Sequence, residues 1–254
     1  MWAQNAGRDL DGPDRGDQHR RAGSVGNKAG LFAVASAILL LVACTPGARE
    51  EENAPATEEP ATENAVETTA DEVATGFLEA FGAFDAERAI TYLAEDAGIS
   101  DLIGSVGAGG VEGTQEEFRI LVSLLEAEGY RQMLDSCEEM GSLASGTGVR
   151  CGFDFHLFGS DRIGLGPFGG SYFDVYVRDG EVVRASMSWE TEKFSPQVWE
   201  PFAEWVSTAH PDDAALMYQD QTRSGVRIAE ESIPLWKRHV RGYVKQVRQE
   251  TEGP

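Results

Sequence analysis

The sequence predicts an α+β fold, in which N-terminal helices pack on a curved antiparallel sheet and a helical extension follows. Three observations support this prediction. Apolar residues recur at helical spacing between residues 73 and 125, they alternate along 149–158, 172–177 and 182–190, and helical spacing returns after residue 195. One core of ordinary domain size is expected, because the chain has 254 residues, of which 41% are hydrophobic.

Three helices are predicted before the sheet. The first has apolar residues at helical spacing and stops near Gly82. Asp85 caps the second, which extends to Leu93. The third begins at Thr114, which forms a capping box with Glu117, three residues later.

The strands are expected to form two hairpins. The dipeptide Asp179-Gly180 between alternating apolar runs is a strong hairpin pattern. Counting outward from this turn pairs Tyr176 with Val183 and Tyr172 with Met187. One face would then carry these residues: Tyr172, Asp174, Tyr176, Val183, Ala185, Met187 and Trp189.

A second hairpin is predicted around Ala144, within the turn-rich stretch GSLASGTG. Cys137 and Cys151 would then face each other on adjacent strands. An oxidising exterior lets two such thiols pair, so a Cys137–Cys151 disulfide is expected. Two free buried thiols are the alternative.

Helices followed by a curved sheet that ends in the hairpin FDVYVRDGEVVRASMSWE resemble the NTF2-like superfamily, which includes SnoaL-type cyclases and ketosteroid isomerases. The resemblance covers about residues 71–192 and includes FLEAFGAFDAERAITYLAEDAGISD and GTQEEF. It implies a cone-shaped domain with a pocket. The pocket candidates are Phe77, Tyr172, Asp174, Tyr176, Ala185, Met187 and Trp189.

The resemblance also implies two candidate catalytic residues. The segment AEDAGISDLIGS is similar to the isomerase segment that carries the general-base aspartate, which places Asp101 in that role. Asp174 would be the protonated aspartate that donates a hydrogen bond. Phe77 stands where the isomerases have a tyrosine, and an oxyanion donor is therefore lacking. The alternative is that Asp101 caps a turn and Asp174 lies on a solvated face or bonds a neighbouring tyrosine.

The segment 31–43 reads LFAVASAILLLVA and follows basic residues, as in a secretory signal peptide. It is shorter than the roughly 20 apolar residues of a membrane-spanning helix. Leu41-Val42-Ala43-Cys44 resembles the lipobox of bacterial lipoproteins. We therefore predict a signal peptide over 1–43 and a lipid on Cys44 that anchors the exported chain to the outer face of the cytoplasmic membrane.

Residues 44–70 are rich in Glu, Ala, Thr and Pro and predict an acidic disordered tether. The NTF2-like domain is expected over 71–194 and a helical extension over 195–254. In the extension, Trp236, Val240 and Tyr243 lie on one stripe of a basic helix. We expect this stripe to pack on its own domain, although such a helix can also bind a membrane or a partner.

Composition excludes several function classes. A formal charge of −22 argues against nucleic-acid binding. The four histidines are scattered along the sequence, and no HExxH, CxxC, EF-hand or phosphate-loop spacing occurs, so neither a metal site nor a cofactor is expected.

Three functions stay open. The first is a non-catalytic domain that binds a small apolar ligand. The second is a lyase, isomerase or cyclase that uses Asp101 and Asp174. The third is an interaction domain that forms a homodimer or docks through the sheet or the C-terminal helices. A non-enzymatic function is preferred because Phe77 lacks the hydroxyl.

Overall fold

The computed structural model describes residues 68–106, 111–220, 223 and 225–253. The predicted signal peptide, the lipobox cysteine Cys44 and nearly all of the predicted tether lie outside this part of the chain. Within it, no helix combines the length and the apolar character needed to cross a bilayer.

Four helices lie in the N-terminal half of the described chain. They are α1 (Ala70–Gly82), α2 (Ala86–Ile90), α3 (Ser100–Gly104) and α4 (Gln115–Glu128). The predicted capping box is present, since the Glu117 N–H donates to the Thr114 hydroxyl at 3.1 Å and the Glu117 carboxylate accepts from the Thr114 N–H at 2.9 Å.

The second predicted helix is shorter than expected. It ends at Ile90, and Leu93 begins strand β1 (Leu93–Gly98) instead of continuing the helix. The helix ends before Leu93 because pairing with β5 (Glu181–Ser188) takes the place of further helical hydrogen bonds. The Val182 N–H donates to the Tyr92 carbonyl at 2.8 Å, which fixes this segment against the sheet.

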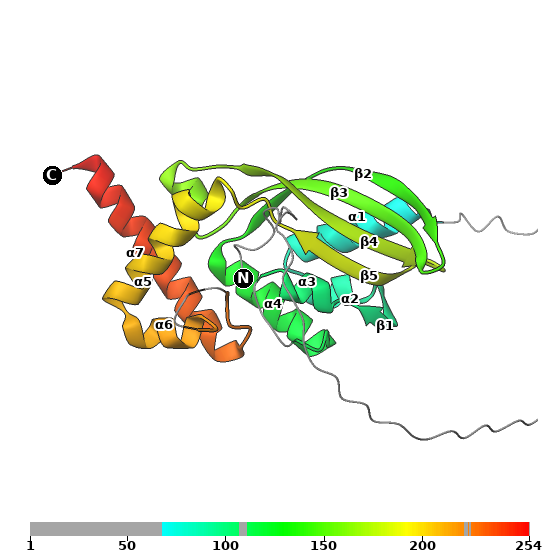
Figure 1. Cartoon of the computed structure of the whole chain (residues 1–254), viewed down its shortest axis with the longest axis horizontal. Helices are drawn as coiled ribbons and strands as arrows, with labels where there is room; N and C mark the ends of the chain where they lie inside the picture. Colours follow the sequence, from blue (N-terminus) through cyan, green and yellow to red (C-terminus); the bar gives the residue numbers. More distant parts are fainter. Residues whose placement is uncertain (1–67, 107–110, 221–222, 224, 254) are drawn as a thin grey trace, which may run out of the picture. The chain divides into compact units, whose positions relative to one another are not determined.

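The sheet has five strands in the order β1-β5-β4-β3-β2. The other four strands are β2 (Arg131–Leu143), β3 (Gly146–His156), β4 (Phe168–Arg178) and β5 (Glu181–Ser188), and these pair antiparallel. Strand β1 pairs parallel to β5, so the sheet is mixed where an antiparallel one was expected. The predicted α+β class, with N-terminal helices against a curved sheet, is confirmed (Figure 1).

The hairpin of β2 and β3 carries the predicted disulfide. Cys137 and Cys151 are direct partners in the antiparallel ladder, and their sulfur atoms are bonded. The turn lies between Leu143 and Gly146, as the glycine-rich stretch predicts.

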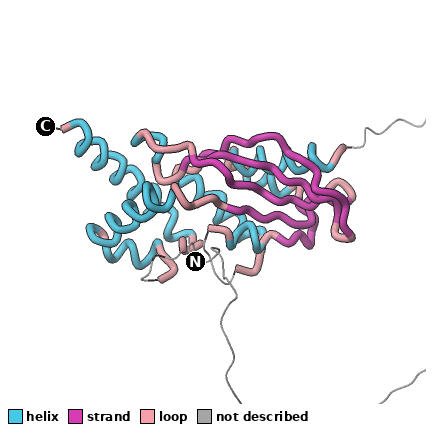
Figure 2. Tube along the Cα trace, turned by 45° about the horizontal axis from the view of Figure 1, so that its top comes forward, coloured by secondary structure: helices cyan, strands magenta, loops and turns pink. Residues whose placement is uncertain are grey.

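The predicted helical extension is present and lies beyond one end of the sheet in both views (Figures 1 and 2). It contains a π-helical turn (Ser195–Trp199), α5 (Glu200–Ala209), α6 (Pro211–Met217), a short 3-10 turn (Glu230–Ser232) and α7 (Ile233–Glu252). Its apolar side chains pack on its own domain: the rings of Trp236 and Phe202 lie 5.5 Å and 4.9 Å from the ring of Phe158, two residues after the end of β3.

Candidate functional site

Aromatic side chains pack in the core between the helices α1 and α4 and the sheet. Phe77 is fully buried, and its ring lies 6.2 Å from that of Phe118 on α4. The ring of Phe173 on β4 lies 4.4 Å from that of Phe153 and 5.9 Å from that of Phe81. These contacts occupy the region where the resemblance implies a pocket.

The seven predicted pocket residues divide between the core and the outer face of the sheet. Ala185 and Met187 are buried in the core with Phe77, and Trp189 packs against that core. The remaining three, Tyr172, Asp174 and Tyr176, alternate with buried residues of β4 and therefore point to the opposite face.

The predicted register of this hairpin is wrong by one residue. Arg178 pairs with Glu181 as expected, but Val182 and Val183 together oppose one position, so Tyr176 pairs with Arg184 and Asp174 with Ser186. Such a bulge reverses the faces of all residues beyond it. As a result, Tyr176 and Asp174 of β4 share the outward face with Arg184 and Ser186 of β5.

Both candidate catalytic carboxylates are held by arginines. Asp174 accepts two hydrogen bonds from Arg150, at 2.7 Å and 2.8 Å, and that guanidinium lies 4.0 Å from the ring centre of Tyr172. Asp101, in the first turn of α3, accepts a hydrogen bond from Arg184 at 2.6 Å and is exposed. Each carboxylate therefore has a separate positively charged partner at the protein surface.

A pocket of about 410 Å³ lies in the helical extension. It is built where the chain doubles back after α6. Tyr218 forms an isolated antiparallel bridge with Val226, and the Arg227 N–H donates to the Met217 carbonyl at 2.9 Å. This pairing brings Arg227 beside Tyr218. The lining residues are Ser207, Pro211, Ala214, Ala215, Tyr218, Gln219, Asp220, Arg223 and Arg227.

Two arginines give the pocket its chemical character. Arg223 and Arg227 are half-buried, and neither guanidinium has an ion-pair partner among the described residues. The only acidic residue in the described lining is Asp220. Two cationic groups beside Pro211, Ala214 and the ring of Tyr218 form a surface that suits an anion with an apolar body.

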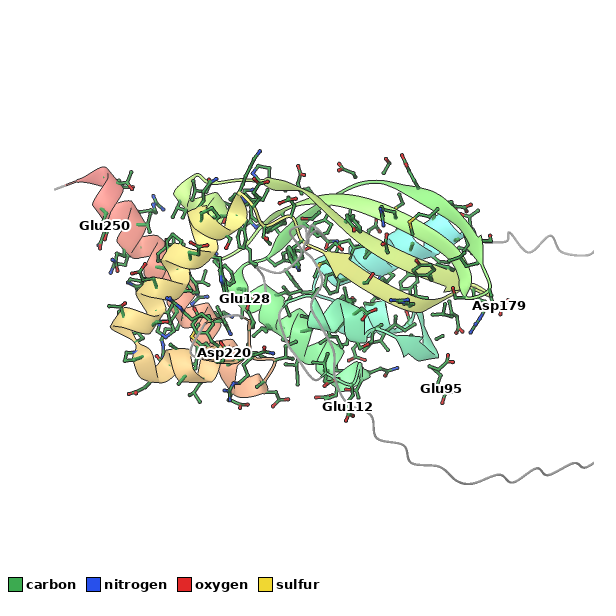
Figure 3. The ribbon with its side chains drawn as sticks, viewed as in Figure 1. Glu95, Glu112, Glu128, Asp179, Asp220 and Glu250 are labelled. Atoms are coloured by element: carbon green, nitrogen blue, oxygen red, sulfur yellow. A yellow bond between two sulfur atoms is a disulfide. The ribbon has the colours of Figure 1, made fainter. Side chains whose placement is uncertain are left out.

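Behind the pocket lie polar groups that are buried without a hydrogen-bond partner. The Tyr218 hydroxyl, one Glu128 carboxyl oxygen and the Trp236 indole nitrogen have none within the described structure. Glu128 ends α4 at the join with the C-terminal helices (Figure 3). The rings of Tyr218 and Trp236 lie 5.5 Å apart.

Burial changes the proton affinity of these groups. It raises the pKa of Glu128 well above its usual value, so this carboxyl group is neutral over a wide pH range. Burial also raises the pKa of the Tyr218 hydroxyl, and the nearby Glu128 adds to this effect, whereas Arg223 opposes it. Unpartnered buried polar groups cost about 1–3 kcal/mol each, which proteins tolerate mainly where a water or a ligand completes the site.

Sequence reasoning missed this site, although one pattern pointed to it. Glu128 lies seven residues after Leu121, on the apolar stripe of α4, and a charged residue on such a stripe is unusual. Tyr218, Arg223 and Arg227 belong to a segment with no periodicity, and only the doubling back of the chain brings them together.

The structure also brings together residues that are scattered in the sequence. His210 and His239, from the α5–α6 joint and from α7, lie with their ring centres 4.5 Å apart and beside Asp213.

Comparisons with known proteins give structural similarity without a match in sequence. No protein-family model matches the chain, and no curated protein matches it by sequence. An NTF2-like protein of unknown function from Cytophaga hutchinsonii is 13% identical, with 50% of this chain and 95% of that chain covered and a TM-score of 0.35.

Two further structures are described as candidate polyketide cyclases. The Pseudomonas putida protein is 20% identical, with 51% of this chain and 98% of that chain covered and a TM-score of 0.34. The Xanthomonas campestris protein is 19% identical, with 50% and 93% covered and a TM-score of 0.36. About half of this chain is matched in each case, and likeness at this level carries no inference about a ligand or a reaction.

Proposed function

We propose that this chain is an exported lipoprotein whose folded domain binds a small organic anion without transforming it. The observation that carries the proposal is the pocket beside Tyr218, where neither Arg223 nor Arg227 has an ion-pair partner among the described residues, in a chain of net charge −22. A volume of about 410 Å³ falls in the usual range of small-molecule sites, roughly 300–1,000 Å³.

The lining defines the class of ligand. The two guanidinium groups would bind a carboxylate, sulfonate or phosphate group, and Ser207 and Gln219 offer further hydrogen bonds. Pro211, Ala214 and the tyrosine ring would cover an apolar part. The small apolar ligand that the sequence suggested is therefore replaced by an amphipathic anion, in the helical extension and not inside the cone.

A non-catalytic role is supported by the arrangement of the acidic residues. An enolising enzyme needs one ionised and one neutral carboxyl group around a shared reacting atom. Asp101 and Asp174 instead pair with Arg184 and Arg150 at the surface, while aromatic side chains pack in the core between α1 and the sheet.

The proposed location is the outer face of the cytoplasmic membrane. It is supported by the lipobox ending in Cys44 and by the disulfide, which suits an oxidising compartment. The acidic tether would hold the domain away from anionic headgroups.

Isothermal titration calorimetry of the full chain in lipid nanodiscs tests the binding function. The probe is 2-naphthalenesulfonate, and the neutral 2-naphthalenesulfonamide has nearly the same shape without the charge. We expect the sulfonate to bind and the sulfonamide to bind at least about tenfold more weakly, because hydrogen bonds to charged groups contribute about 1.5–3 kcal/mol.

Variants locate this binding. Arg227→Gln should weaken sulfonate binding by about 10- to 100-fold. Arg241→Gln is the matched control, because Arg241 is exposed on α7 and does not line the pocket. Equal sulfonate affinity in the wild type and both variants would argue against the proposed site.

A homodimer is the second candidate function. The edge strand β2 exposes large apolar side chains, with Met133 at 42%, Met140 at 44% and Leu143 at 64% of their full accessibility. A second copy of the chain could cover this strand. Light scattering after size-exclusion chromatography tests the idea: a dimer that Met140→Glu separates supports it, and a monomer at high concentration excludes it.

A further inference from the structure

Three potential metal ligands converge at the joint between α5, α6 and α7. His210 lies between α5 and α6, Asp213 is in the first turn of α6, and His239 is on the buried stripe of α7. One potential ligand atom from each of these side chains lies within 4.8 Å of the other two. In a bound zinc site, nitrogen and oxygen ligands about 2.0–2.2 Å from the ion lie roughly 3–3.5 Å apart, so small side-chain movements would close this triad on an ion.

The hydrogen bonding leaves ligand atoms available. The Asp213 Oδ2 atom is 2.8 Å from His239 Nε2 and 2.5 Å from a nitrogen of Arg238. The Asp213 Oδ1 atom and both ring nitrogens of His210 have no hydrogen-bond partner among the described residues. These free atoms, on two elements, face a histidine on a third.

The protonation states also suit a cation. His239 is 2% exposed, and burial is the main cause that lowers its pKa, which favours the neutral imidazole that binds metals. The hydrogen bond from His239, followed by the hydrogen bond and the positive charge of Arg238, lowers the pKa of Asp213.

We propose that His210, Asp213 and His239 form a binding site for a divalent first-row transition-metal ion such as Zn²⁺. Two imidazoles and one carboxylate are a ligand set that such ions favour, and the remaining coordination positions would hold water. The ion would join the α5–α6 joint to α7 and so stiffen the helical extension that contains the pocket.

Neighbouring side chains help to position the triad. The Trp205 ring lies 5.3 Å from that of His210 and 6.0 Å from that of His239, both edge to face. Gly242 makes room for it, since a Cβ atom there would come within 3.1 Å of the indole. The indole therefore forms one wall of the site and limits how far either imidazole can rotate.

Arg238 distinguishes a metal site from a simple cluster of ion pairs. Its guanidinium bonds the same carboxylate and places a positive charge beside the site, yet its side chain is 59% exposed and free to move outward. A cation must compete with this charge. Removing the guanidinium should therefore strengthen metal binding, although it breaks a bond in the cluster.

Titration of Co²⁺ into the full chain in detergent, purified through a histidine-free tag, tests the site. Bound Co²⁺ gives visible d–d absorption that reports its coordination, and competition with Zn²⁺ gives the Zn²⁺ affinity. We expect a single ion per chain and an increase in Tm when Zn²⁺ is added. His210→Ala and Asp213→Asn should weaken binding by more than about 100-fold, beyond the usual effect of removing a supporting residue.

Two further variants complete the test. Arg238→Gln should bind Zn²⁺ more tightly than the wild type. His156→Gln is the control, because that histidine bonds Ser160 and is not a member of the triad, so its loss should leave metal binding unchanged. The proposal is overturned if the wild type binds neither ion, or if His210→Ala, folded by circular dichroism, binds Co²⁺ as the wild type does.

Discussion

The guanidinium of Arg150 bonds both carboxylate oxygens of Asp174, across neighbouring strands β3 and β4, while it lies over the ring of Tyr172. A catalytic role implied by the family resemblance requires Asp174 to donate a hydrogen bond. Here both of its oxygens accept hydrogen bonds from an arginine, so the geometry is that of a cross-strand ion pair.

Replacement of Asp174 by asparagine should therefore have a small structural effect. The Arg150 side chain is 47% exposed, and pairs of this kind contribute about 0.2–1 kcal/mol. Urea unfolding should show a loss within that range, and the affinity for 2-naphthalenesulfonate should not change. A large loss of ligand binding with unchanged stability would show that Asp174 belongs to the binding site.

Replacement of Glu128 by leucine should stabilise the protein at neutral pH. The pKa of this buried carboxyl group is raised in the folded state above its ordinary value of 4.5. The folded chain therefore binds the proton more tightly than the unfolded chain does. The contribution of this group to stability is full below pH 4.5 and is lost as the pH rises through the raised pKa.

The free energy of unfolding of Glu128→Leu should exceed that of the wild type by about 1–3 kcal/mol at pH 7, and the difference should shrink toward pH 4. Glu126→Leu is the matched control, because Glu126 is exposed on the same helix. The same gain in both variants, or a difference that does not depend on pH, would contradict a buried neutral carboxyl group.

Removal of the disulfide should destabilise the sheet. The bond joins β2 and β3 across a sequence separation of 14 residues, and loops of this size contribute about 3 kcal/mol in the chain-entropy model. Urea unfolding of a Cys137→Ala and Cys151→Ala double variant should show a loss of this order. Reduction should shift the unfolding midpoint of the wild type and leave that of the variant unchanged. If reduction does not change the midpoint of the wild type, the disulfide does not stabilise the fold.

Replacement of Cys44 by serine should release the chain from the membrane. Without the thiol no lipid can be attached, and the acidic tether would not hold the domain at an anionic surface. Fractionation should find the wild type with the membranes, and mass spectrometry should find an acylated N-terminal cysteine. Cys137→Ser is a control for general cysteine loss. A Cys44→Ser chain that still fractionates with membranes would refute the lipid anchor.

Local sequence patterns were sufficient to predict much of the fold. The capping box at Thr114, the turn at Asp179-Gly180 and the pairing of Cys137 with Cys151 each depend on a few neighbouring residues, and all three are present. The parallel pairing of β1 with β5 could not be predicted in the same way. It joins segments about 90 residues apart, and no local pattern encodes such a contact.

The candidate site was harder to predict than the fold. A bulge at Val182 and Val183 pairs Asp174 with Ser186, so that Asp174 lies on the face opposite to Ala185 and Met187, with which the unbulged register had grouped it. The pocket beside Tyr218 and the histidines at the α5–α6 joint depend on tertiary packing of the extension. Their residues have no common spacing in the sequence, so only the fold brings them together.

Native mass spectrometry of the full chain, extracted gently from the membrane in which it is made, tests the binding function most directly. The wild type should carry a small anionic adduct that is released on unfolding. An Arg223→Gln and Arg227→Gln double variant should lose this adduct while it retains the fold and the lipid on Cys44. A wild type without any adduct, or the same adduct at the same occupancy in the double variant, would contradict the assignment of this pocket.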